Sequence, residues 1–206
     1  GAIDSTGAVV IPIEYTNSLT SVNNGRLGVQ KNASWFYVDM KGQIVSDKYD
    51  RIGNFHQGYA SVCLNKLWGA IDLQNRVVVP LEWQGVAPIV DPKLIWVKKD
   101  NLYYLYDGVQ KSVRLKQGFA NVSNFDNEMA YVMSDGKWGI IDPDGKVLVP
   151  CLFEKEEDMV LAKQYMLAED KKNLTEIEAL RVIARFDSDT NMFKITSVIP
   201  DKHWDY

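Results

Sequence analysis

The sequence has few residues of the kinds that carry most enzymatic chemistry. Among 206 residues there are two histidines and two cysteines, and neither His56 nor His203 lies in a nucleophile-elbow, zinc-protease or cysteine-histidine motif. We therefore interpret both histidines as ordinary loop or surface residues, and we predict no cofactor and no enzymatic activity. A hydrolase with an unrecognised pair of carboxylates stays open, because glycoside hydrolysis needs only two carboxyl groups held across a cleft.

Long apolar runs and clusters of positive charge are also missing. No run approaches the roughly 20 apolar residues that a membrane-spanning helix needs, so we predict no transmembrane segment. The net charge is −4, and the 23 Lys and Arg residues are scattered along the chain, which argues against nucleic acid as a partner. The sequence opens without a signal peptide, but it opens inside a repeat, which leaves room upstream for a further strand and an export signal.

The two cysteines do not indicate a disulfide. Cys63 is expected in a strand and Cys151 just after one, at different positions of the repeat. They could pair only if distant repeats met, so we favour two buried free thiols and leave the redox compartment undecided.

What the sequence does contain is an internal repeat, clearest where KLWGAIDLQNRVVVP (66–80) returns as GKWGIIDPDGKVLVP (136–150). Aligned on the position after a recurring Trp, the units stand 35, 33, 35 and 35 residues apart, at Gly1, Phe36, Gly69, Tyr104 and Gly139. The recurring aromatic residues are Trp35, Trp68, Tyr103 and Trp138. A repeat of this length predicts supersecondary units that stack and bury their apolar faces against each other.

Two turn positions recur in the units. Four residues after the aromatic comes an aspartate (Asp4, Asp39, Asp72, Asp107 and Asp142), and three residues later a glycine or asparagine (Gly7, Gly42, Asn75 and Gly145), with Gln110 as the exception. This spacing predicts a short loop in which the Asp side chain accepts backbone amides and the glycine takes the left-handed conformation. A second turn is expected upstream, at Asn32, Asn65, Asp100 and Asp135. Each unit is therefore predicted to be a three-stranded β-meander.

The third strand of each unit carries further expectations. It often ends in proline (Pro12, Pro80 and Pro150), which we expect to stop the ladder, and an aromatic residue follows (Tyr15, Tyr49, Trp83 or Phe153), which we expect to plug the core. The run Val77–Val79 is apolar at every position, which suits a central strand buried on both faces.

These columns resemble the bacterial WG-repeat family, whose pattern here is W-G-x-[IV]-D-x-x-G-x-[VI]-[VIL]-[VI]-P followed by an aromatic residue. The resemblance covers roughly residues 1–154; the units at Trp68 and Trp138 carry Trp-Gly, whereas those at Trp35 and Tyr103 depart from it. The resemblance implies a β-repeat scaffold with no established catalytic activity, usually taken as a binding or interaction module in exported or envelope-associated proteins. It thus favours a periplasmic or extracellular location over the cytoplasm, and it supplies no catalytic residues.

Residues 155–206 fall outside the repeat, and we predict that they cap it. Lys155–Lys172 is rich in helix formers and has no Gly or Pro, which predicts a helix over the open end of the array. The runs LRVIARF and MFKITSVI flank a cluster of turn formers, which predicts a β-hairpin. Residues 1–154 are then an open stack of repeats, or a propeller-like ring if the hairpin supplies the strand missing from the first unit.

No metal site is predicted. The run Asp187–Asn191 imitates the start of a calcium loop, but that loop needs Gly at its sixth position and Glu at its twelfth, where this chain has Met192 and Val198. A turn explains the run better. The recurring aspartates already have a turn-closing role, and no second column of ligands accompanies them.

Trp96 and Tyr131 are the candidate ligand-binding residues. Their column holds Gly28 and Ser61 in earlier units, so the fold does not require an aromatic residue there. If neighbouring units stack in register, the two rings lie close enough to bind a sugar or anchor a protein; the alternative is that they fill space left by the irregular fourth unit. The leading hypothesis is a non-catalytic scaffold that binds a protein or cell-envelope component, and the first rival is a carbohydrate-binding module.

Overall fold

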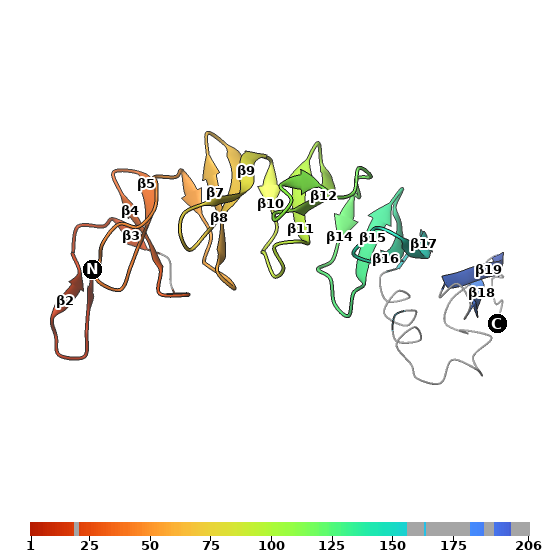
Figure 1. Cartoon of the computed structure of the whole chain (residues 1–206), viewed down its shortest axis with the longest axis horizontal. Coiled ribbons are helices and arrows are strands. Elements are labelled where there is room, and N and C mark those ends of the chain that lie inside the picture. The colour runs from red at the N-terminus through yellow and green to blue at the C-terminus, as the bar shows by residue number, and fades with distance from the viewer. Residues whose placement is uncertain (19–20, 156–162, 164–181, 188–191, 199–206) are drawn as a thin grey trace, which may run out of the picture. The chain divides into compact units, whose positions relative to one another are not determined.

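The computed structural model describes residues 1–18, 21–155, 163, 182–187 and 192–198. Its strands form six separate antiparallel sheets, each built from strands that follow one another in the sequence (Figure 1). The chain divides into two compact units, Gly1–Gly118 and Phe119–Tyr206, and each is described by itself. The prediction of a mainly β repeat protein is confirmed.

The first unit holds four sheets and the second holds two. In the first unit these are β1 (Ala2–Ile3) with β2 (Val9–Ile11); β3 (Asn17–Ser18), β4 (Leu27–Lys31) and β5 (Ser34–Val38); β6 (Arg51–Ile52), β7 (Tyr59–Leu64), β8 (Leu67–Asp72) and β9 (Val77–Trp83); and β10 (Gly85–Val86), β11 (Ile95–Lys99), β12 (Leu102–Asp107) and β13 (Ser112–Val113). In the second unit they are β14 (Asn121–Val122), β15 (Ala130–Ser134), β16 (Lys137–Ile141) and β17 (Val147–Phe153), then β18 (Val182–Asp187) with β19 (Met192–Val198).

Each complete sheet contains one strand more than the predicted meander. The meander corresponds to β7, β8 and β9 in the third sheet, and the additional strand, β6, is two residues long. So short a strand shows no alternation of polar and apolar residues, which is why sequence patterning misses it. β18 and β19 pair as the predicted hairpin, although its loop, 188–191, lies outside the described residues. So does the predicted helix, apart from Lys155 and Lys163, and the choice between a stack and a ring stays a prediction.

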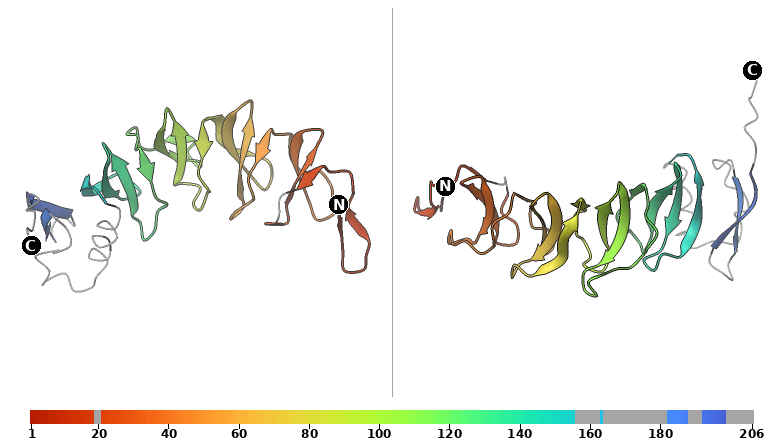
Figure 2. Two further views of the ribbon diagram at one scale, coloured as in Figure 1. Left: turned by 180° about the vertical axis from the view of Figure 1, so that it is seen from behind. Right: turned by 90° about the horizontal axis from the view of Figure 1, so that it is seen from above.

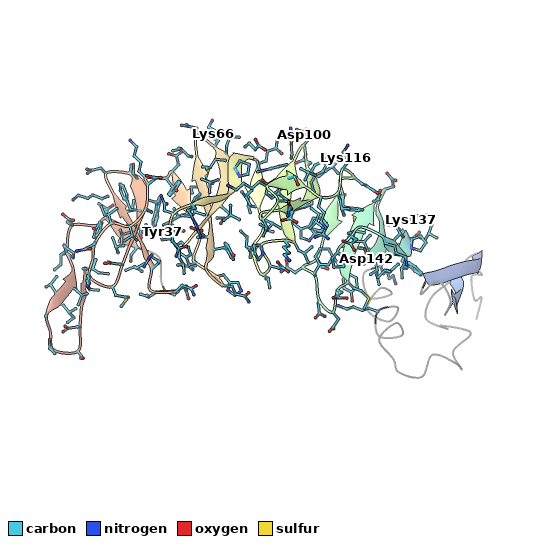
Figure 3. The ribbon with its side chains drawn as sticks, in the orientation of Figure 1. Tyr37, Lys66, Asp100, Lys116, Lys137 and Asp142 are labelled. Carbon is cyan, nitrogen blue, oxygen red and sulfur yellow. The ribbon has the colours of Figure 1, made fainter. Side chains whose placement is uncertain are left out.

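The upstream turn of each of the four later repeats is a two-residue hairpin loop with positive φ at both residues. The pairs are Asn32-Ala33, Asn65-Lys66, Asp100-Asn101 and Asp135-Gly136. This type I′ geometry matches the twist of the flanking strands. In the compact unit Gly1–Gly118, these turns lie along one edge of the sheets, where Lys66 and Asp100 are labelled (Figure 3). In the compact unit Phe119–Tyr206, Lys137 and Asp142 lie at opposite ends of the strand β16 (Figure 3).

The recurring aspartates close the downstream turns, as predicted. In the third sheet, Asp72 Oδ1 accepts the amides of Gln74 and Arg76, both at 2.9 Å, and Asn75 has a φ of 59°. Asp4, Asp39 and Asp142 accept the two equivalent amides at 2.8 to 3.0 Å. In the irregular fourth unit Asp107 accepts the amides of Val109 and Gln110, and Lys111 takes the left-handed conformation.

These hydrogen bonds favour the ionised carboxylates. Hydrogen bonds from Thr6 lower the pKa of Asp4, and the backbone amide of Gln43 lowers the pKa of Asp39. Burial alone would raise the pKa of Asp72, but the amide and guanidinium of Arg76 outweigh it, so that this pKa is lowered too.

The glycine of the Trp-Gly pair lies under a bulge in the outermost strand. From Val79 to Trp83, β9 takes four residue steps where β8 takes two, and the extra residues arch over Gly69. A Cβ on Gly69 would lie 2.5 Å from the carbonyl oxygen of Val79, and one on Gly139 would lie 2.6 Å from that of Val149. Only glycine therefore permits this close approach of two backbones.

In the second and fourth sheets, where the glycine is replaced, the outermost strand is short or absent; β2, beside Gly1, is also short, at three residues. β9 and β17, which face Gly69 and Gly139, are seven residues long. In the repeat that holds Tyr104, the equivalent strand β13 has two residues, which pair with Tyr106 and Asp107. Opposite Phe36 there are isolated bridges, Val38 to Ile44 and Trp35 to Tyr49. At Phe36 the outer segment still takes five residue steps, from Ile44 to Tyr49, where β5 takes three, so extra residues are accommodated there without a continuous strand.

Two expectations about the third strand are wrong. Pro80 and Pro150 do not end it, because β9 and β17 continue through them to Trp83 and Phe153. Proline is tolerated because the strand lies at the sheet edge, where its missing N–H costs no ladder hydrogen bond. The valines 77–79 also lie in this edge strand and not in a central strand, and Val77 is exposed.

Neighbouring sheets of the first unit pack face to face through apolar clusters (Figure 2). The first and second sheets share Ile11, Val29 and Val38; the second and third share Tyr37, Tyr49, Phe55, Ala60, Val62 and Ile71; the third and fourth share Ala70, Val79, Trp83, Ile89, Ile95, Val97 and Tyr106. The Tyr37 and Phe55 rings meet edge to face with centroids 4.7 Å apart. Each sheet is therefore stabilised by its neighbours, as a repeat array requires.

The aromatic residue after the proline pairs across the sheet with the recurring Trp. Trp83 lies opposite Trp68, Phe153 opposite Trp138, and Tyr49 opposite Trp35. Trp83, Phe153 and Tyr49 are all buried, which confirms their predicted core role. The Tyr49 hydroxyl donates to Asn75 Oδ1 at 3.2 Å, whereas Trp83 Nε1 is buried with no hydrogen-bond partner among the described residues.

Replacing Gly139 by Ala should destabilise the protein by about 1–3 kcal/mol, because the new methyl group would force the β17 bulge outward. Urea denaturation measures this. Gly85→Ala is the control, since a Cβ there meets only Lys98 Cβ at an ordinary 3.5 Å. Equal destabilisation by both substitutions would contradict the close-approach explanation.

Trp83→Phe should change the free energy of unfolding by less than about 1 kcal/mol, because lost packing is offset by removing a buried unpaired N–H. Tyr49→Phe should cost about 0.5–1.5 kcal/mol, because it removes a hydrogen bond from the same column. A loss of several kcal/mol for Trp83→Phe would contradict the expected offset between lost packing and the removal of the unpaired N–H.

Acid should destabilise the repeats through the turn aspartates. The folded pKa values of Asp4, Asp39 and Asp72 lie below the ordinary aspartate value of 3.8, so the contribution of these three is complete above that pH and is lost as pH falls through the folded values. Asp39→Asn, whose amide oxygen still accepts hydrogen bonds, should lose less thermal stability between pH 5 and pH 2 than the wild type does. Parallel acid-induced losses in melting temperature would contradict this.

Candidate binding surfaces

The titratable residues in the described part of the chain do not gather into a reactive cluster. No group of three His, Cys, Asp or Glu there is placed to hold a metal ion. The calcium-like run 187–191 is described only at Asp187. His56 is exposed in a turn, and His203 lies outside the described residues.

Both cysteines are free thiols, as the sequence favours. Cys63 is buried in β7, and Cys151 is half-buried in β17. Burial raises the pKa of each thiol, which disfavours the nucleophilic thiolate.

The predicted ligand-binding pair is divided between the two units. Trp96 belongs to the first unit and is 2% exposed, so its ring is part of the core. Tyr131 belongs to the second unit and is half-buried. Ligand binding by Trp96 and Tyr131 together stays a prediction.

Tyr131 contacts a lysine that sequence patterning does not pick out. Lys163 Nζ lies 5.6 Å from the centroid of the Tyr131 ring and 2.7 Å from Asp126 Oδ2. Lys163 is buried, whereas the Asp126 side chain is largely exposed. Lys163 therefore makes a cation–π contact with Tyr131 of β15.

The outermost strand of every repeat exposes one β-branched apolar residue at the same position. Register identifies the column, because each member lies opposite the third residue after the recurring aromatic: Val9 opposite Ile3, Ile44 opposite Val38, Val77 opposite Ile71, Val113 opposite Tyr106, and Val147 opposite Ile141. The exposed fractions are 60, 52, 43, 37 and 42% in that order. We call these five residues the outer column.

Sequence reasoning missed the outer column although the signal was present. The column follows the left-handed turn residue by two positions in every unit, including the irregular fourth unit, where Lys111 precedes Val113. Because the third strand was expected to be buried on both faces, its first apolar residue gave no reason to predict a surface.

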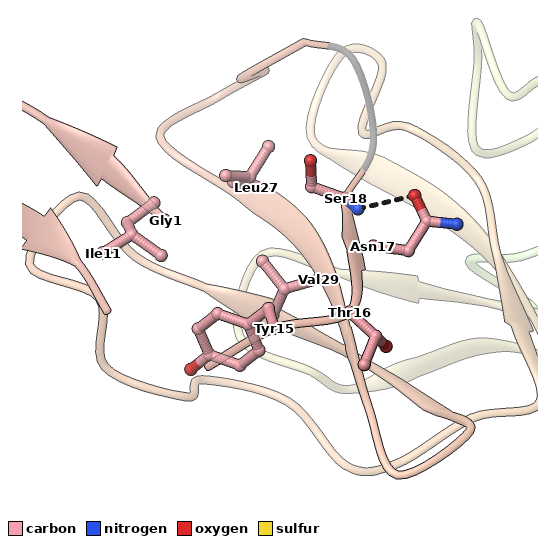
Figure 4. Close-up of a pocket in the computed structure, with 8 residues that line it drawn as sticks. All are labelled: Gly1, Ile11, Tyr15, Thr16, Asn17, Ser18, Leu27 and Val29. Atoms are coloured by element: carbon pink, nitrogen blue, oxygen red, sulfur yellow. Dashed lines mark hydrogen bonds between the residues drawn. The ribbon is translucent and has the colours of Figure 1, made fainter. Parts of the chain in front are cut away.

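A cavity of about 300 Å³ opens beside the first sheet (Figure 4). Ile11, Leu27 and Val29 give it apolar walls, and Tyr15 and the polar residues 16–18 line the remainder. Gly1 lies at its margin.

No helix among the described residues is long and apolar enough to cross a membrane.

Several solved structures are similar to this chain at low identity. Hsv2p of Kluyveromyces lactis is 12% identical, with a TM-score of 0.39, over 65% of this chain and 49% of that one. A eukaryotic initiation factor is 13% identical, with a TM-score of 0.45, over 72% of this chain and 46% of that one. PorZ, a surface component of the type-IX secretion system of Porphyromonas gingivalis, is 10% identical, with a TM-score of 0.39, over 64% and 21%. The chain thus spans less than half of each structure, and no curated protein matches it.

The family described as WG containing repeat matches residues 1–35, 35–68, 68–103 and 138–155. The match omits most of the fourth unit, where Tyr103-Tyr104 replaces Trp-Gly and the outermost strand is short. Since the match covers more than half of the sequence, and since the sheets repeat with the same period, the chain belongs to the WG containing repeat family.

Proposed function

We propose that the repeat array is a non-catalytic scaffold that binds a protein partner through its outer column. The observation that carries the proposal is the recurrence of an exposed β-branched residue in all five repeats. Isolated exposed apolar residues are ordinary on a protein surface. A row of them at one repeat position gives a partner a regular series of apolar contacts.

The stacking of the sheets supports this use of the column. Between Gly1 and Gly118, successive sheets pack face to face. Because Val9, Ile44, Val77 and Val113 hold the same repeat position, we infer that they follow one another along one side of these sheets. Their strands are edge strands in the described residues, because β2, β9 and β13 each pair on one side only. A partner can therefore meet both apolar side chains and unpaired backbone groups there.

The other recurring residues stabilise the repeat itself. The turn aspartates accept their own backbone amides, and the Trp-Gly glycine admits the bulge. In this proposal, specificity for the partner comes from residues beside the outer column that differ between repeats. Because the family resemblance implies envelope-associated relatives, the partner is sought first among cell-envelope proteins.

Replacing Ile44, Val77 and Val113 together by Thr should abolish partner binding and leave the fold intact, because Thr keeps the β-branched shape but puts a hydroxyl in place of a valine methyl or the isoleucine ethyl group at exposed positions. Proteins captured from envelope and cytosolic fractions by the wild type and by the variant are compared by mass spectrometry. A specific partner should be retained by the wild type and lost by the variant, with melting temperatures within a few degrees.

The matched control is Val90→Thr with Val109→Thr, which changes two residues of similar exposure outside the column, 46% and 56%. Capture of the same proteins by the triple variant as by the control would show that the outer column is not the binding surface. Glycan binding at Trp96 and Tyr131 is a separate prediction with a separate readout, retention on immobilised polysaccharide.

A further inference from the structure

Basic side chains accompany the outer column in the four later repeats. We compare the stretch from three residues before each column residue to one residue after it. The basic residues in these stretches are Lys41 beside Ile44, Arg76 beside Val77, Lys111 and Arg114 beside Val113, and Lys146 beside Val147. The one acidic residue in the same stretches is Asp144. The whole chain has a net charge of −4, so the charge beside the outer column is opposite in sign to that of the chain.

In the third repeat the positive charge lies outside and the negative charge inside. Arg76 Nε donates to Asp72 Oδ2 at 2.7 Å, but the Arg76 side chain is 74% exposed and the Asp72 side chain only 12%. The other oxygen of Asp72 accepts backbone amides of its own turn. A molecule that approaches Val77 therefore meets the guanidinium group of Arg76 before it meets the carboxylate.

The turn of the second repeat carries two cations. The amides of Gln43 and Lys41 lower the pKa of Asp39, and the positive charges of Lys41 and Arg26 lower it further, so both cations lie near this carboxylate. Lys41 is exposed. Arg26 Nη2 also donates to the carbonyl oxygen of Leu73 at 3.2 Å, in the equivalent turn of the third repeat. The positive charge thus extends from one downstream turn towards the next.

The fourth repeat has the same arrangement with a larger excess of positive charge. Lys111 and Arg114 are exposed residues, whereas Asp107 is buried, with its Oδ2 4.0 Å from Arg114 Nη1. The loop beside this turn adds one exposed residue of each sign, Asp91 and Lys93. Its charges balance, so the excess beside the outer column remains positive.

We propose that the outer column binds an acidic segment of its partner protein, in which carboxylates alternate with small apolar side chains. This inference rests on the proposed function, because it gives the chemistry of a partner for the same surface. The apolar side chains contact the valines and the isoleucine, and the carboxylates pair with the flanking Lys and Arg residues. Such charge complementarity speeds association and excludes basic partners. The outer column has no Trp, Phe or Leu, the residues that anchor proteins in a membrane surface, which favours a protein segment over an anionic membrane.

The test is fluorescence anisotropy of the full chain with two labelled synthetic peptides of equal length. Glu alternates with Val in the acidic peptide, and Gln alternates with Val in the neutral one. The acidic peptide should bind about tenfold more tightly at low salt. The difference should shrink as salt is added, because exposed charges are screened. Equal binding of the two peptides, or no binding of the acidic peptide, would overturn the proposal.

A protein variant assigns the binding to the cations beside the outer column. Lys41→Gln with Lys111→Asn removes two exposed positive charges and leaves the ion pair between Arg76 and Asp72 in place. Asn suits residue 111, whose φ is 53°. The double variant should bind the acidic peptide about fivefold more weakly, with an unchanged melting temperature.

The matched control removes the same charge at the other end of the strands. Lys66→Asn with Lys99→Gln changes two exposed lysines beside the upstream turns, and residue 66 also has a positive φ, 67° (Figure 3). This variant should bind the acidic peptide as the wild type does. An equal loss of affinity in the two double variants would overturn the proposal, since the attraction would then depend on net charge alone.

Two further outcomes separate this inference from the proposed function. Suppose the triple Thr variant of the outer column loses the captured partner while Lys41→Gln with Lys111→Asn retains it. The outer column is then the binding surface and its partner is not acidic, which overturns the inference alone. Vesicles of phosphatidylserine and phosphatidylcholine are the second probe. Vesicle binding by the wild type that the double variant loses would also overturn the inference, because the anionic partner would be a membrane.

Discussion

The fold depends on the close approach of two backbones where the outermost strand pairs with the strand that holds Trp-Gly, β9 with β8 and β17 with β16. Over Gly69 and Gly139 that strand bulges until its carbonyl groups take the space that a side chain would need. The bulge lets the strand run on to Trp83 or Phe153, which then covers the recurring Trp. Where Phe36 or Tyr104 stands instead, the strand shrinks to bridges or to two residues. The glycine thus accompanies the two long outermost strands, whereas Tyr49 reaches the core opposite Trp35 through isolated bridges.

This division of labour explains how a repeat protein can keep its architecture and vary its surface. Within each repeat, the aspartate turn, the glycine and the buried valine of the inner strand satisfy internal needs. The outer column is different, because an apolar residue stays exposed there in each repeat. This surface follows from sheets that pair only with their own strands and pack through their faces.

Local chemistry was readable from the sequence, and the position of a strand in its sheet was not. Asp72 and Asn75 predict their turn because the hydrogen bonds that define it are made within five residues. The valines 77–79 look the same in a central strand and in an edge strand, since composition does not record which neighbours are missing. The burial of Trp96 depends on contacts distant in sequence, and Lys163 meets Tyr131 across more than thirty residues. The position of Trp96 and Tyr131 stands out in the sequence because its residues differ between repeats. The outer column is regular, and its apolar residues look like those of a buried strand.

Hydrogen exchange of the unmodified protein tests the role of the glycine most directly. Amides of residues 77–83 and 147–153 should be protected, because long outermost strands pair there with the Trp-Gly strands. The equivalent segments after Phe36 and Tyr104 should exchange much faster, because their ladders are reduced to bridges or two residues. Equal protection of all four segments would contradict the account, since the length of the outermost strand would then not depend on the residue beneath it.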